Sequence, residues 1–478
     1  MEYEPVIGLE VHVQLNTKSK LFCSCSTEFG AEPNKNTCPV CMGYPGVLPR
    51  LNYEALRKAI MVGLALNCKI AEYTKFDRKS YFYPDLPKGY QISQYDIPLN
   101  YEGYLDFELP DGTVKRVRII RAHLEEDAGK LIHSENGNES YVDLNRAGTP
   151  LVEIVSYPDM FSIDEAYYYL QTLRNTMKYI GVSDVNMEEG SLRVDANVSV
   201  RPKGSDKLGT KVEIKNMNSF GFLRKALEYE INRQISVLEK GQNVIQETRL
   251  FDAETGKTYT MRTKEYAEDY RYFPDPDLPP VVLKRDIIES IRSMLPELPY
   301  QRFRRFIEQY SLPRYDAEIL TSDKNLADYF ESAVKGYRGE PKKVSNWIMS
   351  EVMRYLNENS IDISLFSVPP EYISELLNMV DEGKISIKIA KDVFPDIVRN
   401  PKPPSKLIEE RGLVQVSDTS EIEKVCIDVI KENPLEVEKY KSGKTNVLGF
   451  LVGQVMKKTQ GKANPKLVNE TLTRLLSN

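Results

Sequence analysis

Apolar and polar residues alternate along several short segments in the first part of the chain, which is typical of half-buried β-strands. The pattern is clearest at residues 6–15, and similar segments follow at 117–122, 151–155, 192–200 and 211–215. Two longer segments, Ile163–Ile180 and Phe220–Glu239, have the composition and spacing of helices. The first part of the chain is therefore predicted to be a mixed α/β region with an antiparallel sheet.

The pattern changes after a proline-rich stretch at residues 274–280. Because proline cannot donate a backbone hydrogen bond or continue a helix, this stretch is predicted to be a loop and a domain boundary. Apolar residues then recur at helical spacing, as at 303, 306, 307 and 310, and a second proline-rich stretch at 400–405 is typical of a linker. Residues 447–456 carry a further apolar helical stripe. The expected fold class is α+β, with a mixed domain at 1–290, an all-helical domain at 291–405 and a small helical tail domain at 406–478.

Length and charge narrow the class of protein. The chain has 478 residues, with 64 basic and 70 acidic side chains and a net charge of −6. Its surface is therefore not positively charged as a whole. A local basic patch would still allow RNA binding. It has no apolar run of about 18 residues, so no membrane span is predicted. The acidic start, Met1–Pro5, lacks the pattern of a signal peptide, and a cytoplasmic location is expected.

Four of the six cysteines lie close together, as Cys23, Cys25, Cys38 and Cys41. Two close pairs of thiolates can surround one tetrahedral Zn²⁺, and four protein ligands leave no open position for catalysis. The pattern therefore predicts a structural zinc knuckle. The alternative from spacing alone is four ordinary, partly buried cysteines.

Acidic residues interrupt several of the predicted apolar strands. Glu10 and His12 are two residues apart and should project from the same face of one strand. Buried carboxylates are costly unless a cation compensates them, and oxygen-rich sites suit Mg²⁺ or Mn²⁺. The other acids in such segments are Glu125, Glu153, Asp195 and Glu213. Spacing alone leaves open whether they converge on a metal or face solvent.

The usual nucleotide and hydrolase motifs are missing from the sequence. Neither a Gly-x-x-x-x-Gly-Lys-Ser/Thr loop nor a clear Gly-x-Gly-x-x-Gly is present. With three histidines in the whole chain, a histidine-based triad is hard to build. A nucleotide would therefore have to bind without a standard phosphate loop.

Taken together, the motifs resemble the B subunits of glutamyl/aspartyl-tRNA amidotransferases, the GatB/GatE family, over almost the whole chain. Many long motifs in one order make a chance match implausible. Besides the cysteine cluster, the segments that carry the resemblance are Ile7–Leu15, Tyr81–Gln91, His123–Lys130, Asp143–Glu153, Ser191–Asn197, Lys211–Ser219, Asp269–Pro274 and Gly449–Met456.

The resemblance implies an ATP- and Mg²⁺-dependent ligase with glutamine as amido donor. The B subunit would phosphorylate the side-chain carboxylate of mischarged Glu-tRNA(Gln) or Asp-tRNA(Asn). Ammonia from a partner amidase, the family's A subunit, would then displace phosphate, and a small C subunit would complete a heterotrimer. The mischarging aminoacyl-tRNA synthetase is a further partner that the resemblance allows. The three predicted domains correspond to the family's cradle, helical and tail domains.

The resemblance also suggests roles for particular residues. It implies that His12, Glu125 and Glu153 hold a Mg²⁺ at the reaction site. Glu10, Asp195 and Glu213 would hold a second metal or line the ammonia route. The expected contacts to ATP phosphates are Lys79, Lys88, Lys215 and Arg193, each with the alternative of an ordinary solvated or ion-paired side chain.

The tail contains a lysine-rich stretch, with seven lysines and no acid from Lys439 to Lys466. Such a segment can contact phosphates without reading sequence, and the family uses its tail to sense tRNA shape, so tRNA binding is expected here. Two other classes of function remain as alternatives: a non-catalytic tRNA-binding scaffold with a zinc knuckle, and a free-standing small-molecule kinase. Whether Glu-tRNA(Gln), Asp-tRNA(Asn) or both are substrates is outside what the sequence indicates.

Overall fold

The computed structural model of the chain describes residues 2–134, 139–263, 270–413, 419–459 and 463–477. Asp269 and Lys462, which belong to segments singled out above, lie outside these ranges. The chain forms two compact units that divide between Gln301 and Arg302. The first is mixed α/β with a mainly antiparallel sheet and the second is helical, which confirms the predicted α+β class. No helix in the described ranges is long and apolar enough to cross a membrane.

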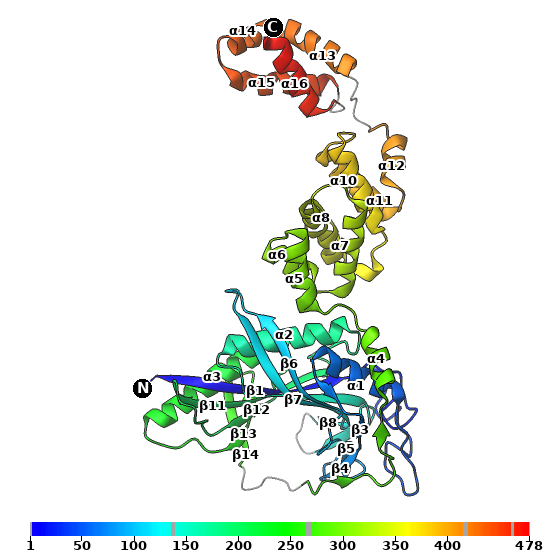
Figure 1. Ribbon diagram of the computed structural model, residues 1–478, viewed down its shortest axis with the longest axis vertical. Coiled ribbons are helices and arrows are strands. Elements are labelled where there is room, and N and C mark those ends of the chain that lie inside the picture. The colour runs from blue at the N-terminus through cyan, green and yellow to red at the C-terminus, as the bar shows by residue number, and fades with distance from the viewer. Residues whose placement is uncertain (1, 135–138, 264–269, 414–418, 460–462, 478) are drawn as a thin grey trace. The chain divides into compact units, whose positions relative to one another are not determined.

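A nine-stranded sheet organises the first unit (Figure 1). All of its strand pairs are antiparallel except β12 with β13, which is parallel. Strands from distant parts of the sequence are neighbours, so residues that are far apart in the chain share one surface. In spatial order the strands are β14 (Lys257–Thr263), β13 (Glu247–Asp252), β12 (Val212–Lys215), β11 (Leu192–Pro202), β1 (Tyr3–Gln14), β10 (Pro150–Ser156), β7 (Val114–Glu126), β6 (Asn100–Glu108) and β2 (Lys69–Ile70).

The central strand β1 has one apolar and one polar face. Leu9, Val11 and Val13 are almost completely buried, whereas Glu10 and His12 alternate with them. Because successive side chains of a strand point to opposite faces, the apolar residues join one core and the polar ones share the other surface. Residues of the helices α1 (Tyr53–Ala65), α2 (Ile163–Tyr179) and α3 (Phe220–Glu239) belong to the same core.

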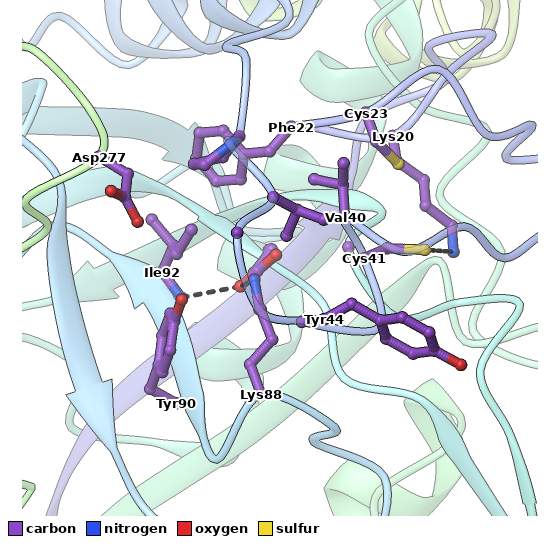
Figure 2. A pocket seen from close by; sticks show the side chains of 16 residues that line it. Lys20, Phe22, Cys23, Val40, Cys41, Tyr44, Lys88, Tyr90, Ile92 and Asp277 are labelled. Carbon is purple, nitrogen blue, oxygen red and sulfur yellow. Dashed lines mark hydrogen bonds and ion pairs between the residues drawn. The ribbon is translucent and has the colours of Figure 1, made fainter.

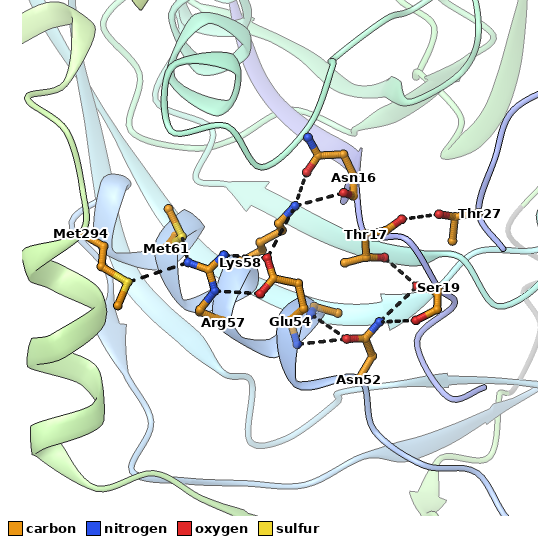
Figure 3. Close-up of polar contacts among 11 residues, drawn as sticks. Asn16, Thr17, Ser19, Thr27, Asn52, Glu54, Arg57, Lys58, Met61 and Met294 are labelled. Carbon is orange, nitrogen blue, oxygen red and sulfur yellow. Dashed lines mark hydrogen bonds and ion pairs between the residues drawn. The ribbon is translucent and has the colours of Figure 1, made fainter. Parts of the chain in front are cut away.

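The helix α1 is absent from the sequence-based expectation, because apolar residues cover most of its circumference and weaken the helical period. It begins at Asn52, whose Oδ1 accepts from the backbone N–H groups of Glu54 and Ala55 (Figure 3). The Asn52 Nδ2 donates to the backbone oxygens of Ser19 and Lys20. The helix start is thereby tied to the segment that leads into the first cysteine pair.

Shorter strands form three small sheets in the same unit. One consists of β15 (Phe273–Pro274), β4 (Asp77–Ser80) and β5 (Tyr90–Ser93), and the pairs are β16 (Val281–Val282) with β3 (Tyr73–Thr74) and β8 (Lys130–His133) with β9 (Ser140–Asp143). The proline-rich stretch 274–280 therefore begins at the end of β15 and leads into β16, and both strands belong to small sheets of the first unit.

The remaining elements are helical, as the spacing of apolar residues predicts. The last four helices have an apolar core of their own, which includes Cys426, Leu451, Val455 and Leu472. The helices are α4 (Arg285–Ser293), α5 (Pro299–Tyr310), α6 (Arg314–Leu320), α7 (Lys324–Gly336), α8 (Pro341–Trp347), a π-helical turn at Ile348–Val352, α9 (Met353–Asn359), a 3₁₀ turn at Ile363–Leu365, α10 (Pro370–Asp381), α11 (Ile387–Arg399), α12 (Pro404–Glu410), α13 (Thr419–Glu432), α14 (Pro434–Lys441), a 3₁₀ turn at Thr445–Val447, α15 (Leu448–Lys458) and α16 (Pro465–Ser477).

Packing of α2 against the sheet should contribute to the stability of the first unit. Leu173 is fully buried on α2, so Leu173→Ala is expected to lower the free energy of unfolding by about 2–5 kcal/mol through lost burial and a cavity. The control, Leu208→Ala, changes a side chain that is 55% exposed and should have an effect within about 0.5 kcal/mol. Urea denaturation followed by circular dichroism measures both, and equal effects would contradict this view of the core.

Candidate active site

A row of polar side chains crosses the sheet on the face opposite the core. In the register of the strands, Arg193 on β11 is opposite His12 on β1, which is opposite Glu153 on β10, which is opposite His123 on β7. Residues directly opposite each other project from the same face. Four strands thus bring two histidines, one acid and one arginine into a single line.

His12, Glu125 and Glu153 each offer a ligand atom, and the three atoms lie within 4.8 Å of one another. The His12 Nε2 is 3.5 Å from a Glu153 oxygen, and both glutamates are almost fully buried. Two carboxylates and an imidazole in this arrangement could hold a divalent cation such as Mg²⁺ or Mn²⁺.

His123 lies on the other side of the same acids. Its Nε2 is 3.4 Å from Glu125 and 3.7 Å from Glu153, and its buried Nδ1 has no hydrogen-bond partner among the residues that the structure describes. Sequence reasoning included His123 in a motif and gave it no role. Its position on alternate residues with Glu125 was the available signal, because both then face the same side of β7.

The electrostatics of the cluster depend on these close pairs. Burial would raise the pKa of Glu153, but His123 and His12 together with Lys79 hold it well below its ordinary value. Burial would likewise lower the pKa of His12, yet its hydrogen bond and charge interaction with Glu153 raise that pKa to about 9. Glu153 is therefore an ionised carboxylate in a buried place, which is the state that a metal ligand needs, whereas His12 would have to lose a proton when a metal binds to it.

Strand β5 supports Glu125 from outside the main sheet. The Ser93 hydroxyl donates to Glu125 Oε2 at 2.9 Å, and both side chains are buried. This bond fixes the orientation of one proposed metal ligand. Ser93 is a second residue that sequence reasoning missed, and a lone serine in a short strand carries no signal that could have found it.

A second group consists of Glu10, His12 and Asp195, whose ligand atoms also lie within 4.8 Å of one another. Glu10 and Asp195 are opposite each other in the register of β1 and β11. Burial and the Glu153 charge raise the pKa of Glu10 above its ordinary value. His12 is shared between the two groups, so they form one continuous cluster of possible ligands.

Lys215 and Glu213 form an ion-paired group with Asp195. Lys215 Nζ contacts Asp195 at 2.5 Å and Glu213 at 2.9 Å, so both acids are already paired with a cation. Burial would lower the pKa of Lys215, but Asp195 and Glu213 raise it above its ordinary value. Glu213 is outside both groups that could hold a metal within the described residues.

The other basic residues occupy three separate places. Lys79 on β4 has its Nζ 4.8 Å from the Tyr270 ring centroid, and in the described ranges it forms no ion pair with a carboxylate. Burial would lower its pKa, but Glu125 and other nearby groups raise it above its ordinary value. Arg193 donates to Asp127 at 2.9 Å. Lys88 contacts Glu126, a neighbour of Glu125 that points to the opposite face of β7.

The four cysteines gather as the spacing indicates. Each sulfur of Cys23, Cys25, Cys38 and Cys41 lies within 4.8 Å of the others, and none forms a disulfide. The backbone N–H of Cys38 points at Cys41 Sγ at 3.2 Å. A hydrogen bond from Cys23, helped by the Lys20 ammonium, lowers the pKa of Cys41 to about 4. The donor set suits tetrahedral Zn²⁺.

Together, these features define a multidomain α+β protein with two separate ligand sets, one of oxygen and imidazole and one of sulfur. The chain belongs to the GatB/GatE family: the model of the GatB/GatE catalytic domain matches residues 5–289, and that of the GatB domain matches residues 328–476. The resemblance seen in the motifs is thereby confirmed. Members of this family are amidotransferase subunits, which places the chain among the carbon–nitrogen ligases.

Curated relatives match over the full length of the chain. The B subunit of the aspartyl/glutamyl-tRNA(Asn/Gln) amidotransferase of Persephonella marina is 59% identical over 476 residues, covering 100% of both chains. Proteins of the same name from Carboxydothermus hydrogenoformans and Thermodesulfovibrio yellowstonii are 57% and 56% identical, covering 98% and 100% of both chains.

The cysteine cluster generates a direct prediction. We expect purified protein to contain one zinc per chain, and Cys38→Ser to lose it because three thiolates bind more weakly than four. Elemental analysis after dialysis measures the metal content. Cys68→Ala is the matched control, since Cys68 is a buried cysteine outside the cluster and its removal should leave the zinc in place. Equal zinc content in both variants would contradict a zinc site at these four residues.

Proposed function

We propose that this chain is the B subunit of a tRNA-dependent amidotransferase that phosphorylates the side-chain carboxylate of mischarged Glu-tRNA(Gln) or Asp-tRNA(Asn). A carboxylate is a poor electrophile, and transfer of the ATP γ-phosphoryl group to it gives an acyl phosphate and ADP. Ammonia then attacks the carbonyl carbon, a C–N bond forms, and inorganic phosphate leaves. The buried group of His12, Glu125 and Glu153 is the observation that carries this proposal.

The proposed roles follow from charge and position. When bound, Mg²⁺ would neutralise charge on the transferring phosphoryl group. Glu125 and Glu153 would hold it as carboxylates, with Ser93 orienting Glu125. Lys79 is the best placed of the four proposed phosphate contacts. Its ammonium interacts electrostatically with Glu125 and Glu153, and it forms no ion pair with a carboxylate in the described ranges.

The other proposed phosphate contacts are less available. Lys215 is paired with Asp195 and Glu213, and Arg193 is paired with Asp127. Lys88 is engaged by Glu126. We retain Glu10, Asp195 and Glu213 as proposed ligands of a second metal or as lining of the ammonia route, with Glu10 and Asp195 favoured for the metal because they share a ligand group with His12.

The proposed assembly is a cytoplasmic heterotrimer of this chain with an amidase (the A subunit) and a small C subunit. The relatives are named as B subunits, which supports an assembly with other chains. Glutamine hydrolysis is assigned to the partner amidase. The mischarging synthetase is retained as a further proposed partner.

The alternative of a non-catalytic scaffold is weaker, because a scaffold has no use for acids that converge in a buried place. We expect Glu125→Gln to reduce ATP hydrolysis dependent on Glu-tRNA and Mg²⁺ by about 100-fold or more, since several kcal/mol of charge stabilisation would be lost. The control Glu102→Gln removes an exposed acid that pairs with Lys69, and it should keep the activity. Unchanged hydrolysis in Glu125→Gln would favour the scaffold.

The tail is the proposed contact for the tRNA body. The lysines at 439, 441, 444, 457, 458 and 466 are all exposed. Lys457 and Lys458 lie in the last turn of α15, and Lys458 pairs with Glu432 on α13 at 2.6 Å. An exposed cationic surface of this kind suits phosphate contacts that track shape rather than sequence.

Neutralising Lys457, Lys458 and Lys462 to Gln should weaken aminoacyl-tRNA binding and reduce the slope of log affinity against log salt by about 2, since each lost phosphate contact removes about 0.7–0.9. Filter binding over a salt series measures this. The control neutralises the exposed Lys69, Lys203 and Lys207 of the first unit. An unchanged affinity and salt slope in the tail variant would rule out tRNA binding by these lysines.

A further inference from the structure

Lys20 is a completely buried lysine, with 0% of its surface exposed. Its ammonium donates to Cys41 Sγ at 3.5 Å (Figure 2). It also donates to the backbone oxygen of Leu144 at 3.2 Å. Within the described ranges, no carboxylate oxygen comes within ion-pair distance of it. A buried ammonium in such a place is costly unless some other negative charge compensates it.

An acid that lines the same cavity does not supply that charge. Glu126 shares a cavity of about 150 Å³ with Lys20 and Cys41, as Figure 2 shows in part. However, Glu126 already accepts from Lys88 and from the backbone N–H of Ile92. One carboxylate with its own ammonium partner leaves the Lys20 charge uncompensated.

The cysteine cluster can supply it. Four thiolates around one Zn²⁺ carry a net charge of about −2, and the Lys20 ammonium points at one of the four sulfurs. Neutral thiols would offer only a weak acceptor. A zinc-bound cluster therefore compensates the buried Lys20 charge more fully than a metal-free one, in which Cys41, with its lowered pKa, is the one thiolate placed against the ammonium.

The Lys20 side chain also has little freedom to point elsewhere. Its backbone N–H donates to Cys25 O, and its backbone oxygen accepts from Asn52. Gly148 has a positive φ of 88°, and a Cβ there would lie 3.4 Å from Lys20 Cδ and 3.6 Å from Cys41 Cβ. These are ordinary van der Waals distances, so the left-handed backbone at Gly148, and not the space beside Lys20, favours glycine there.

We propose that Lys20 is the buried counterion of the four-cysteine metal centre and a positioning residue for Cys41. By donating to Leu144 O as well, it joins the metal centre to the segment that leads into β10, the strand of Glu153. The inference rests on zinc binding at the cysteines, which the zinc content of the wild-type chain tests separately.

The test compares the stability of the full chain with and without zinc. In zinc-loaded protein, Lys20→Met should weaken zinc binding by about 10–100-fold, measured by competition with a chromogenic chelator. In zinc-stripped protein the same variant should lower the melting temperature less than it does in zinc-loaded protein, because the metal-free cluster offers Lys20 less negative charge than the zinc-bound one. The proposal thus predicts that one substitution changes the melting temperature by different amounts in the two states, more with zinc than without it.

The matched control is Lys88→Met, which removes a lysine from the same cavity whose partner is Glu126. Its effect on melting temperature should be the same with and without zinc, and its zinc affinity should match that of the wild type. Lys20→Arg, which keeps the positive charge, should retain more zinc affinity than Lys20→Met. Lys20→Gln serves as a milder neutral variant if Lys20→Met does not fold.

Two results would overturn the proposal in distinguishable ways. If the wild-type chain binds no zinc, both the zinc site and the counterion role fail. If the wild type binds zinc but neutralising Lys20 shifts the melting temperature equally in both states and leaves zinc affinity unchanged, the counterion role alone fails.

Discussion

Charge buried on one face of an antiparallel sheet is the constraint on which the rest of the first unit depends. Glu153 is a buried carboxylate between two histidines, and it is stable there because those histidines and Lys79 hold it ionised. An isolated carboxylate in the same place would be neutral or would unfold the sheet. The opposite face offsets this cost through a continuous apolar core against α1, α2 and α3. The sheet therefore separates a stabilising layer from a charged one.

Much of this arrangement is predictable from the sequence, because it depends on residues that are close together in the chain. The alternation in residues 6–15 places Glu10 and His12 on one face of a strand, which the structure bears out in β1. Helix α3 has the predicted bounds, since a serine N-cap and a regular apolar period mark it. The two cysteine pairs lie together because a short loop joins them. Each of these features depends on neighbours in the chain.

What could not be predicted is the register between distant strands. His12 meets Arg193 and Glu153 across segments that are far apart in the chain, and no periodicity within one segment determines which residues pair. For the same reason, the acid with which each lysine forms an ion pair could not be predicted from the sequence. Lys88 contacts Glu126 and Lys215 contacts Asp195, so tertiary pairing decides which cations stay available to a ligand.

The acidic ligand set and the cavity beside the sulfur set are joined through adjacent residues of β7. Glu125 and Glu126 point to opposite faces, one toward His123 and the other toward Lys88 and the cavity beside Cys41. Strand β5 binds both at once, because Ser93 donates to Glu125 and the Ile92 N–H donates to Glu126. A displacement of β5 that moves one of these bonds must disturb the other, since Ile92 and Ser93 are consecutive. Between Lys20 and Glu126, however, the described residues share a cavity and no hydrogen bond or ion pair, so β5 links the acidic centre to the wall of that cavity and not to a sulfur.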